Sequence, residues 1–349
     1  MYDFVLFDSN AIGYAAQYVT KLHSGGMQTQ AIFNFIKVMR DFKTRYPKAT
    51  LYNIWDGKAE FRFELLPGYK GDRRSDPKQL AEYEAYVKQR PYIARMLEAL
   101  GIPQFTSFIH EADDVAGILL NQILKKHPNA RILLVTGDRD WLQLLRKNVT
   151  WQDIRSDERV VKFENFFEKT GYRTPFAFLQ GKALTGDSSD CISGVGGIGD
   201  LTAPQILAEY GSIKEFWRLC DSGEIEPPTK ALRSLWQGTS PFTKDEWKAQ
   251  FVYVEDETLS EADNAKAKKK ALKAHTDAYI GQGRNLFIRN MKLMQLLKPE
   301  PLQLSQVEFK KGALNEEAFT DLCGELAFMS ILKNVPNFLK PFEPLEIAA

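Results

Sequence analysis

The stretch "ARILLVTGDRD", residues 130–140, decides the expected fold, because it joins a short apolar run to two aspartates, Asp138 and Asp140. A run of this length, rich in β-forming residues and followed by glycine, is typical of a buried strand that ends in a turn. The stretches "YDFVLFDSN" (2–10) and "ATLYNIWDGK" (49–58) are built in the same way and contain Asp8 and Asp56 at their ends. We therefore predict three buried strands, each followed by an acid.

Helical patterns separate these strands. Apolar residues recur at helical spacing in "TQAIFNFIKVMRDFKTRY" (29–46) and in "ADDVAGILLNQILKKH" (112–127). Alternating strands and helices favour an α/β fold with a central, mostly parallel sheet flanked by helices. In such sheets ligands bind at the carboxyl ends of the strands, where these acids are expected to lie.

The pattern changes at about residue 171, which suggests two regions. We expect residues 1–170 to form the α/β domain, with a charged, tyrosine-rich helical excursion at about 64–90. Residues 171–349 are expected to form a mainly helical region, including a helix over "EEAFTDLCGELAFMSILKN" (316–334). Helical stretches on either side of "SGVGGIG" (193–199) predict a helix-hairpin-helix element at about 175–210.

Composition narrows the functional class. Among 349 residues, 46 Lys and Arg balance 45 Asp and Glu, so the net charge of +1 argues against uniform coating of nucleic acid. The apolar runs are too short to span a bilayer and no basic segment precedes them, so we expect an intracellular protein without membrane contact. Three widely spaced cysteines and four histidines without ligand spacing argue against a disulfide framework and a zinc site.

Nine acids fall at predicted strand ends or helix starts: Asp8, Asp56, Glu111, Asp113, Asp114, Asp138, Asp140, Asp187 and Asp190. A single acid in such a place is usually a helix N-cap or a turn former. Several of them at one sheet edge would repel one another unless a cation neutralised them. Oxygen donors favour Mg²⁺ or Mn²⁺ over zinc, and two such ions suit phosphodiester hydrolysis.

The motifs "LFDSN", "WDG", "PGYKGDR", "HEADDVAG", "VTGDRDWLQL" and "GDSSDCISGVGGIGDLTA" follow one another in this order. Together they resemble the structure-specific 5′ nucleases: flap endonucleases, the 5′ nuclease domain of bacterial DNA polymerase I, and phage 5′→3′ exonucleases. The resemblance spans roughly residues 4–213 and implies a PIN-like nuclease domain. A weaker resemblance of "DAYIGQGRNLFIRN" (277–290) to short phage exonucleases favours a phage origin, and with it the host cytoplasm.

The resemblance also implies roles for the acids. One metal ion would be held by Asp8, Asp56, Glu111 and Asp113. Asp113 would be shared with a second ion, whose other ligands would be Asp138, Asp140 and Asp190. Asp114 and Asp187 resemble the additional acids of the bacterial and phage branch, which would bind through water. Asp8, Asp56, Asp113 and Asp138 are accordingly expected among the catalytic residues.

The glycine-rich hairpin is expected to contact DNA. Glycines let backbone N–H groups approach a phosphate, and the following helix adds its positive N-terminal end. The expected contacts come from Gly194, Gly197, Gly199 and Thr202. In isolation such a loop is more often a plain turn, but the resemblance implies a helix-hairpin-helix element whose carbonyls can also hold K⁺.

The stretch "LPGYKGDRR" places Lys70 and Arg73 three residues apart, on one face if the segment is helical. Both cations would then stabilise charge on the scissile phosphate, and Tyr69 would stack on an unpaired base. The alternative is a solvated helix, whereas the resemblance implies a helical gateway for the 5′ strand. The lysine run at 266–273 is either a solvated helical face or a further, salt-dependent duplex contact.

These observations predict an Mg²⁺-dependent 5′→3′ exonuclease or flap endonuclease that acts near 5′ ends of duplex DNA. By resemblance, RNA–DNA hybrids would also be substrates, and the process served would be DNA replication with removal of RNA primers. Two alternatives remain at this point: a DNA-junction binding protein without catalysis, and an RNA-directed nuclease with the same type of sheet.

Overall fold

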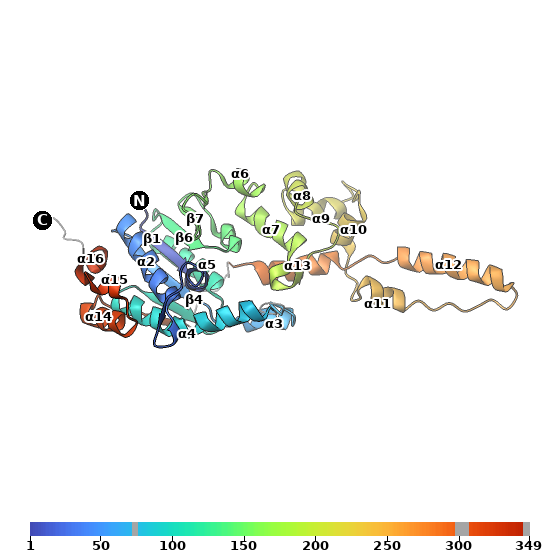
Figure 1. Cartoon of the computed structure of the whole chain (residues 1–349). Coiled ribbons are helices and arrows are strands. Elements are labelled where there is room, and N and C mark those ends of the chain that lie inside the picture. Colours follow the sequence, from blue (N-terminus) through green and yellow to red (C-terminus); the bar gives the residue numbers. More distant parts are fainter. Residues whose placement is uncertain (72–75, 297–306, 345–349) are drawn as a thin grey trace. The chain divides into compact units, whose positions relative to one another are not determined.

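A computed structural model describes residues 1–71, 76–296 and 307–344. The chain divides into two compact units, whose elements are labelled in Figure 1. The first unit comprises Met1–Pro67, Asp72–Thr170 and Leu296–Ala349, and the second comprises Gly68–Gly71 and Gly171–Gln295.

A seven-stranded sheet with the order β11-β5-β4-β1-β6-β7-β8 forms the centre of the first unit. Its parallel strands are β5 (Gln104–Ser107), β4 (Thr50–Trp55), β1 (Phe4–Asp8), β6 (Ile132–Thr136) and β7 (Val149–Asp153). The two edge strands are antiparallel to their neighbours: β11 (Val307–Lys310) and β8 (Val160–Val161). The predicted α/β fold with a mostly parallel sheet is confirmed.

The register of the central strands brings the acids together. Phe7 of β1 lies opposite Asn53 of β4 and Val135 of β6. The carboxyl ends of the three strands therefore finish at the same edge of the sheet. The motifs that follow them, each with an aspartate, begin there.

Helices connect the strands of this unit. They are α1 (Ser9–Ala16), α2 (Gln30–Arg45), α3 (Glu60–Leu65), α4 (Pro77–Ala99), α5 (Ala112–Lys126) and α6 (Phe166–Thr170), with a 3₁₀ helix over Arg139–Leu144 and a small hairpin of β2 (His23–Ser24) and β3 (Met27–Gln28). Burial of Phe35, Ile36 and Met39 explains the apolar spacing of α2, since these side chains form its core-facing stripe.

The C-terminal helices also belong to the first unit: α14 (Glu316–Glu325), α15 (Met329–Leu332), α16 (Val335–Leu339) and a 3₁₀ turn over Lys340–Phe342. Phe319 is fully buried in the same core as Phe35, and its ring stacks on Phe338 with centroids 5.3 Å apart. The sequence pattern instead groups these residues with the helical region after 171. The helix expected over 316–334 is interrupted, because Ala327 adopts a left-handed backbone conformation with φ of 54°.

The second unit is helical. Its elements are α7 (Pro175–Thr185), β9 (Gly186–Asp187), a 3₁₀ turn over Ser188–Asp190, β10 (Ile192–Ser193), α8 (Thr202–Tyr210), α9 (Ile213–Asp221), α10 (Lys230–Gln237), α11 (Lys244–Ala249), α12 (Glu261–Asp277) and α13 (Gly283–Met294). Helices α7 and α8 flank the glycine-rich hairpin. Of the helices in the described ranges, none is both long and apolar enough to cross a membrane.

Candidate active site

Asp8 ends β1 at the shared sheet edge and is almost fully buried. One carboxylate oxygen accepts the Ala11 N–H at 3.0 Å and so caps α1, while the other accepts the Thr136 hydroxyl at 2.8 Å. Burial, reinforced by the nearby Asp56 carboxylate, raises the pKa of Asp8 to about 6. The side chain is thus fixed by neutral donors and faces another acid.

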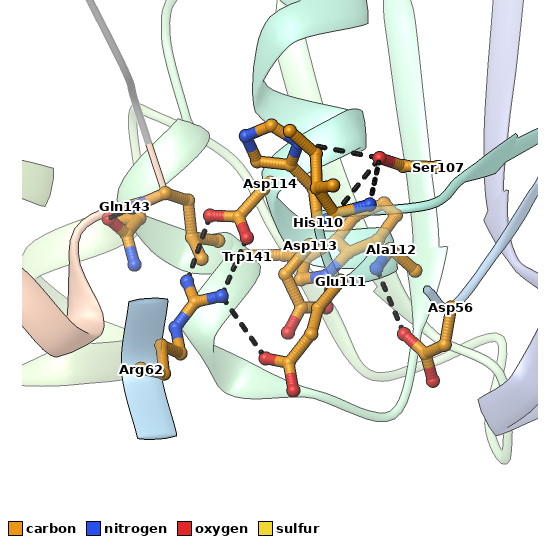
Figure 2. Close-up of polar contacts among 12 residues, drawn as sticks. Asp56, Arg62, Ser107, His110, Glu111, Ala112, Asp113, Asp114, Trp141 and Gln143 are labelled. Atoms are coloured by element: carbon orange, nitrogen blue, oxygen red, sulfur yellow. Dashed lines mark hydrogen bonds and ion pairs between the residues drawn. The ribbon is translucent and has the colours of Figure 1, made fainter. Parts of the chain in front are cut away.

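Asp56 follows β4 and is exposed. Its Oδ1 accepts the Ala112 N–H at 2.9 Å, a contact drawn in Figure 2. This bond ties the end of β4 to the first turn of α5, where an acid interacts favourably with the helix dipole. The contact therefore fixes the start of α5 beside the sheet edge.

Glu111 and Asp113 stand at the start of α5. Trp141, fully buried, donates its indole N–H to Asp113 Oδ1 at 2.6 Å. Burial raises the pKa of Asp113 well above its usual value, and the carboxylates of Asp138 and Asp8 add to this effect. Trp141 therefore orients this carboxylate as well as packing in the core.

Asp138 follows β6 and caps the 3₁₀ helix by accepting the Asp140 N–H at 2.7 Å. Its own N–H donates to the Thr136 hydroxyl oxygen at 2.9 Å, and the Thr136 hydroxyl in turn donates to Asp8. Thr136 thereby links two of the acids. The sequence offers no signal for this role of Thr136 beyond its position before "GD".

Arg62 of α3 is a site residue that the sequence analysis missed. It is 2% exposed, and its guanidinium binds both oxygens of the fully buried Asp114, at 2.6 and 2.8 Å. It also lies 3.3 Å from a carboxylate oxygen of Glu111 (Figure 2). The only hint in the sequence is a cation between two phenylalanines in "FRF".

This arrangement gives Asp114 surroundings unlike those of the other acids. A bidentate arginine–carboxylate pair satisfies both oxygens of the acid with charge-assisted bonds. Asp8 and Asp113, by contrast, receive hydrogen bonds from a hydroxyl, an indole and a backbone N–H. At this sheet edge Asp114 is therefore paired with a cation, whereas Asp8 and Asp113 lie close to other carboxylates that raise their pKa values further than burial does alone.

The donor set fits a hard divalent cation, because carboxylate oxygens predominate. Burial, reinforced by mutual repulsion, also raises the pKa values of Asp8 and Asp113, and a bound cation would relieve that repulsion. Yet within residues 1–71, 76–296 and 307–344, no group of three or more His, Cys, Asp or Glu side chains is arranged as a metal-binding cluster. The acids share a sheet edge without forming a closed cage of ligands.

Asp187 and Asp190 belong to the second unit. Asp187 accepts hydrogen bonds from Lys182 Nζ and from the Ser189 N–H, both at 2.9 Å. Burial alone would raise the pKa of Asp187, but Lys182 and Ser189 outweigh it, and the pKa lies below its usual value. Asp190 is partly exposed, and its carbonyl accepts the Lys70 N–H at 3.0 Å.

The hairpin glycines differ in what they do. A Cβ on Gly194 would lie 2.4 Å from the Thr185 carbonyl oxygen, so packing demands glycine there. Gly197 has a φ of 72°, which favours glycine for conformational reasons. Gly199 has neither constraint, since its φ is ordinary and a Cβ added there would meet no atom within 4 Å.

Thr202 begins α8, and its hydroxyl oxygen accepts the Gly199 N–H at 3.0 Å. The same hydroxyl donates to the Gly199 carbonyl at 3.1 Å. Thr202 thus uses its side chain to close the turn, and the N–H of Gly199 already has a partner within the hairpin.

Residues 67–71 form a turn. The prediction that Lys70 and Arg73 lie on one face required this segment to be helical. Lys70 adopts a left-handed conformation with φ of 56° between Pro67-Gly68 and Gly71, residues that interrupt a helix. Tyr69 is 4% exposed, which leaves its ring little surface for a base, and Lys70 Nζ lies 4.9 Å from the ring centroid. Arg73 lies outside the described residues.

With this geometry in place, comparison with known proteins is informative. Residues 3–171 match the family model for the 5′-3′ exonuclease N-terminal, resolvase-like domain. Over these residues the chain is similar to the N-terminal domain of 5′-3′ exonucleases. The matched range contains the sheet and seven of the nine acids, all except Asp187 and Asp190.

The curated relatives of this chain include bacterial polymerases. DNA polymerase I of Lactococcus lactis is 36% identical over 203 residues, which are 56% of this chain and 22% of the polymerase. DNA polymerase I of Caldicellulosiruptor bescii is 34% identical over 228 residues, 62% of this chain and 25% of the polymerase. The chain thus spans about a quarter of the length of these relatives.

Solved structures share the fold over nearly the whole chain. The bacteriophage T5 5′-exonuclease with bound zinc ions has a TM-score of 0.60 at 18% identity, covering 97% of this chain and 99% of the T5 chain. A bacteriophage T5 flap endonuclease in a pseudo-enzyme-product complex with DNA and metal ions has a TM-score of 0.59 at 18% identity, covering 98% and 99%. At this identity the likeness establishes the fold of the chain.

Proposed function

We propose that this protein is a Mg²⁺-dependent 5′→3′ exonuclease or flap endonuclease that hydrolyses phosphodiester bonds near 5′ ends of duplex DNA. The observation that carries the proposal is the set of repelling acids at one sheet edge, where Asp8 and Asp113 have raised pKa values. The match of residues 3–171 to the 5′-3′ exonuclease family model and the like fold of a T5 flap endonuclease solved with DNA and metal ions support it.

In this proposal the carboxylates hold two divalent ions, with Mn²⁺ able to replace Mg²⁺. Asp8, Asp56, Glu111 and Asp113 serve the first ion, and Asp138, Asp140 and Asp190 serve the second, with Asp113 shared. When bound, such ions lower the pKa of a water molecule and balance charge on the phosphate. Asp187 of the second unit is poorly suited to hold a metal ion directly, because Lys182 already neutralises it.

Asp114 has a different role in this proposal from that of the ligands. Because both of its oxygens bind Arg62, it anchors the first turn of α5 and presents Glu111 and Asp113 to the metals. Trp141 and Thr136 restrain Asp113 and Asp8 in the same way. Such supporting hydrogen bonds orient ligands and strengthen a metal site.

The hairpin and the Lys70 turn complete the proposed site. The hairpin backbone around Gly199, with the N-terminus of α8, contacts phosphates of the duplex, and K⁺ binding by its carbonyls is part of the proposal. Lys70 and Arg73 supply positive charge to the scissile phosphate. RNA–DNA hybrid cleavage, primer removal and a role in phage replication are further parts of the proposal, supported by the family resemblance.

The test is cleavage of a 5′-labelled flap duplex by the full chain, with Mg²⁺ and with EDTA. Asp138→Asn is the decisive variant, because asparagine keeps an oxygen for the Asp140 N–H and loses only the charge. We expect at least a hundredfold loss of cleavage, a rough figure for removal of a charged group that supports the metal, with duplex affinity unchanged.

Asp153→Asn provides a matched control. Asp153 also ends a parallel strand of the sheet, yet Arg155 neutralises it at 2.8 Å, so we expect full cleavage by this variant. If wild-type protein released no label at any concentration, a junction-binding protein without catalysis would be the better description. Faster cleavage of an RNA duplex than of DNA would favour the RNA-directed alternative.

A further inference from the structure

A helical finger extends from the second unit between α10 and α13. It consists of residues 239–281 and contains α11 and α12, which lie side by side (Figure 1). Its two ends are joined at the base, where the Ser240 N–H donates to the Gly281 carbonyl at 3.0 Å and the Tyr279 hydroxyl donates to the Phe242 carbonyl at 3.0 Å. The finger is therefore a folded extension, not a loose loop.

The rotation of α12 about its own axis is fixed. His275 stacks on Trp247 of α11 with ring centroids 5.0 Å apart, and the Trp247 indole N–H donates to the His275 carbonyl at 2.9 Å. At the other end of α12, the buried Asn264 accepts the Asp256 N–H at 2.9 Å and donates to the Asp256 carbonyl at 2.8 Å. One face of α12 is thus held against α11 and its connecting segment.

The opposite face carries four lysines at positions i, i+3, i+4 and i+7, which share one side of a helix. We call them the lysine stripe: Lys266, Lys269, Lys270 and Lys273. All four side chains are exposed. Residues 264–276 contain these four and Lys268 but no acid, whereas the whole chain has a net charge of +1.

The chemistry of the stripe favours a row of phosphates as its partner. Within α12, which is fully described, there is no large exposed hydrophobic side chain. This argues against apolar contact on α12 itself, because a protein interface or a membrane surface needs apolar contact area. Exposed apolar side chains of the finger, such as Val252 and Val254 on the segment that follows α11, lie outside α12. From Lys266 to Lys273 the stripe is about 10 Å long, at 1.5 Å per residue. Because duplex DNA presents one charge per roughly 1.7 Å of its axis, several phosphates lie within that length.

The glycine-rich hairpin of the same unit lacks such charge. Residues 191–203 contain no Lys or Arg, and their single charged residue is Asp200. Helix α13 connects the hairpin with the finger: Asn290 donates to the Ser193 carbonyl at 2.8 Å, and the Gly283 N–H donates to Ser234 Oγ of α10 at 3.1 Å. Hairpin and finger base are therefore held by one helix.

From these observations we propose that the lysine stripe is a second contact with the phosphate backbone of the duplex whose other contact is the hairpin. This inference rests on the proposed function, because it takes duplex DNA as the substrate. The hairpin supplies close, uncharged backbone contact, and the finger supplies the electrostatic attraction that the hairpin lacks.

The experiment measures the affinity of the full chain for a 5′-flap duplex in EDTA, over a series of salt concentrations. In the stripe variant all four lysines become glutamine, which retains good helix propensity. The control removes the same charge from four exposed lysines of the first unit: Lys48, Lys125, Lys126 and Lys147. Circular dichroism checks that both variants keep their helices.

We expect the stripe variant to bind on the order of tenfold more weakly at low salt and to lose up to about 3.6 from its logarithmic salt slope, about 0.9 for each phosphate contact. The control variant should lose markedly less affinity and markedly less of the salt slope. A stripe variant with the affinity and slope of the control would overturn the inference, as would an equal loss on a single-stranded oligonucleotide. Cleavage by wild-type protein in Mg²⁺ is measured in parallel, so failure of the proposed function is recognised separately.

Discussion

At the scale of single residues, the active-site acids are distinguished by what surrounds them. Asp8 lies among a hydroxyl, a backbone N–H and other carboxylates, whereas Asp114 lies against a guanidinium. Burial and the neighbouring carboxylates raise the pKa of Asp8, whereas both oxygens of Asp114 are bound by one cation. Two residues of the same type therefore affect stability in different ways, and each effect can be measured.

Asp8 should make the metal-stripped protein less stable as the pH rises. Because its folded pKa of about 6 exceeds the usual 3.8, the folded state holds the proton more tightly, and stability falls between about pH 4 and pH 6. Asp8→Asn removes this fall while keeping an acceptor for the Ala11 N–H. In EDTA, the difference in unfolding free energy between variant and wild type should shift by about 2 kcal/mol in favour of the variant between pH 4.5 and pH 7.

Urea titrations at pH 4.5 and pH 7 measure this difference. A constant difference at both pH values would show that the Asp8 carboxylate ionises as easily in the folded protein as in the unfolded chain. The result would weaken the case for a repelling acid cluster.

Arg62 should be important for stability, because its removal leaves Asp114 buried without a partner. Arg62→Met is expected to lower the free energy of unfolding by about 3–5 kcal/mol. Combining it with Asp114→Leu should restore much of the loss, since an apolar pair of similar volume is often as stable as a buried ion pair. Equilibrium urea unfolding of both variants and of wild type measures this recovery, and a loss below about 1 kcal/mol for Arg62→Met would contradict the arrangement.

At the scale of elements, the hairpin between α7 and α8 separates glycines needed for folding from one that is not. Gly194 packs against the Thr185 carbonyl, while Gly199 is free of conformational and steric constraint. A glycine that the fold does not require fits a close approach by a ligand. The two positions therefore form a natural pair for comparison.

Gly199→Ala should stabilise the protein by about 0.4–1 kcal/mol, because alanine restricts the unfolded chain, and yet weaken duplex binding several-fold. Gly194→Ala should instead destabilise it by about 1–3 kcal/mol through overpacking. Thermal unfolding and duplex titration in EDTA measure both properties. Unchanged binding by a stable Gly199→Ala protein would remove this glycine from the DNA contact.

Sequence patterns predict the elements of the first unit well where the physical signal is local. Strands of buried β-formers and the stripe of α2 follow from periodicity, and the acids follow from their places after strands. The Arg62–Asp114 pair escapes prediction because its partners are far apart in sequence and meet only when α3 packs beside α5. The turn at Lys70 was not predicted, because the spacing of the charged residues suggests a helix. Gly68 and Gly71 favour a turn, and their effect is the stronger one.

At the scale of the whole molecule, the chain leaves its first unit after Thr170 and returns to it at Leu296. No sequence pattern signals this return, because the amphipathic C-terminal helices are equally compatible with either unit. Their destination is set by long-range packing of Phe319 and Phe338 into the core that holds Phe35. Periodicity identifies an apolar face but does not identify its partner.

Because the C-terminal helices belong to the first unit, that unit is completed only at the end of synthesis. On the ribosome, α2 and strands β1 to β8 emerge early, but Phe319 and Phe338, which complete their core, are translated only after α13 is complete. The second unit can therefore finish folding while the first unit still exposes apolar surface to water. A message truncated before codon 316 would yield a product in which that apolar surface stays exposed. We expect chaperones and proteases to act on such a product.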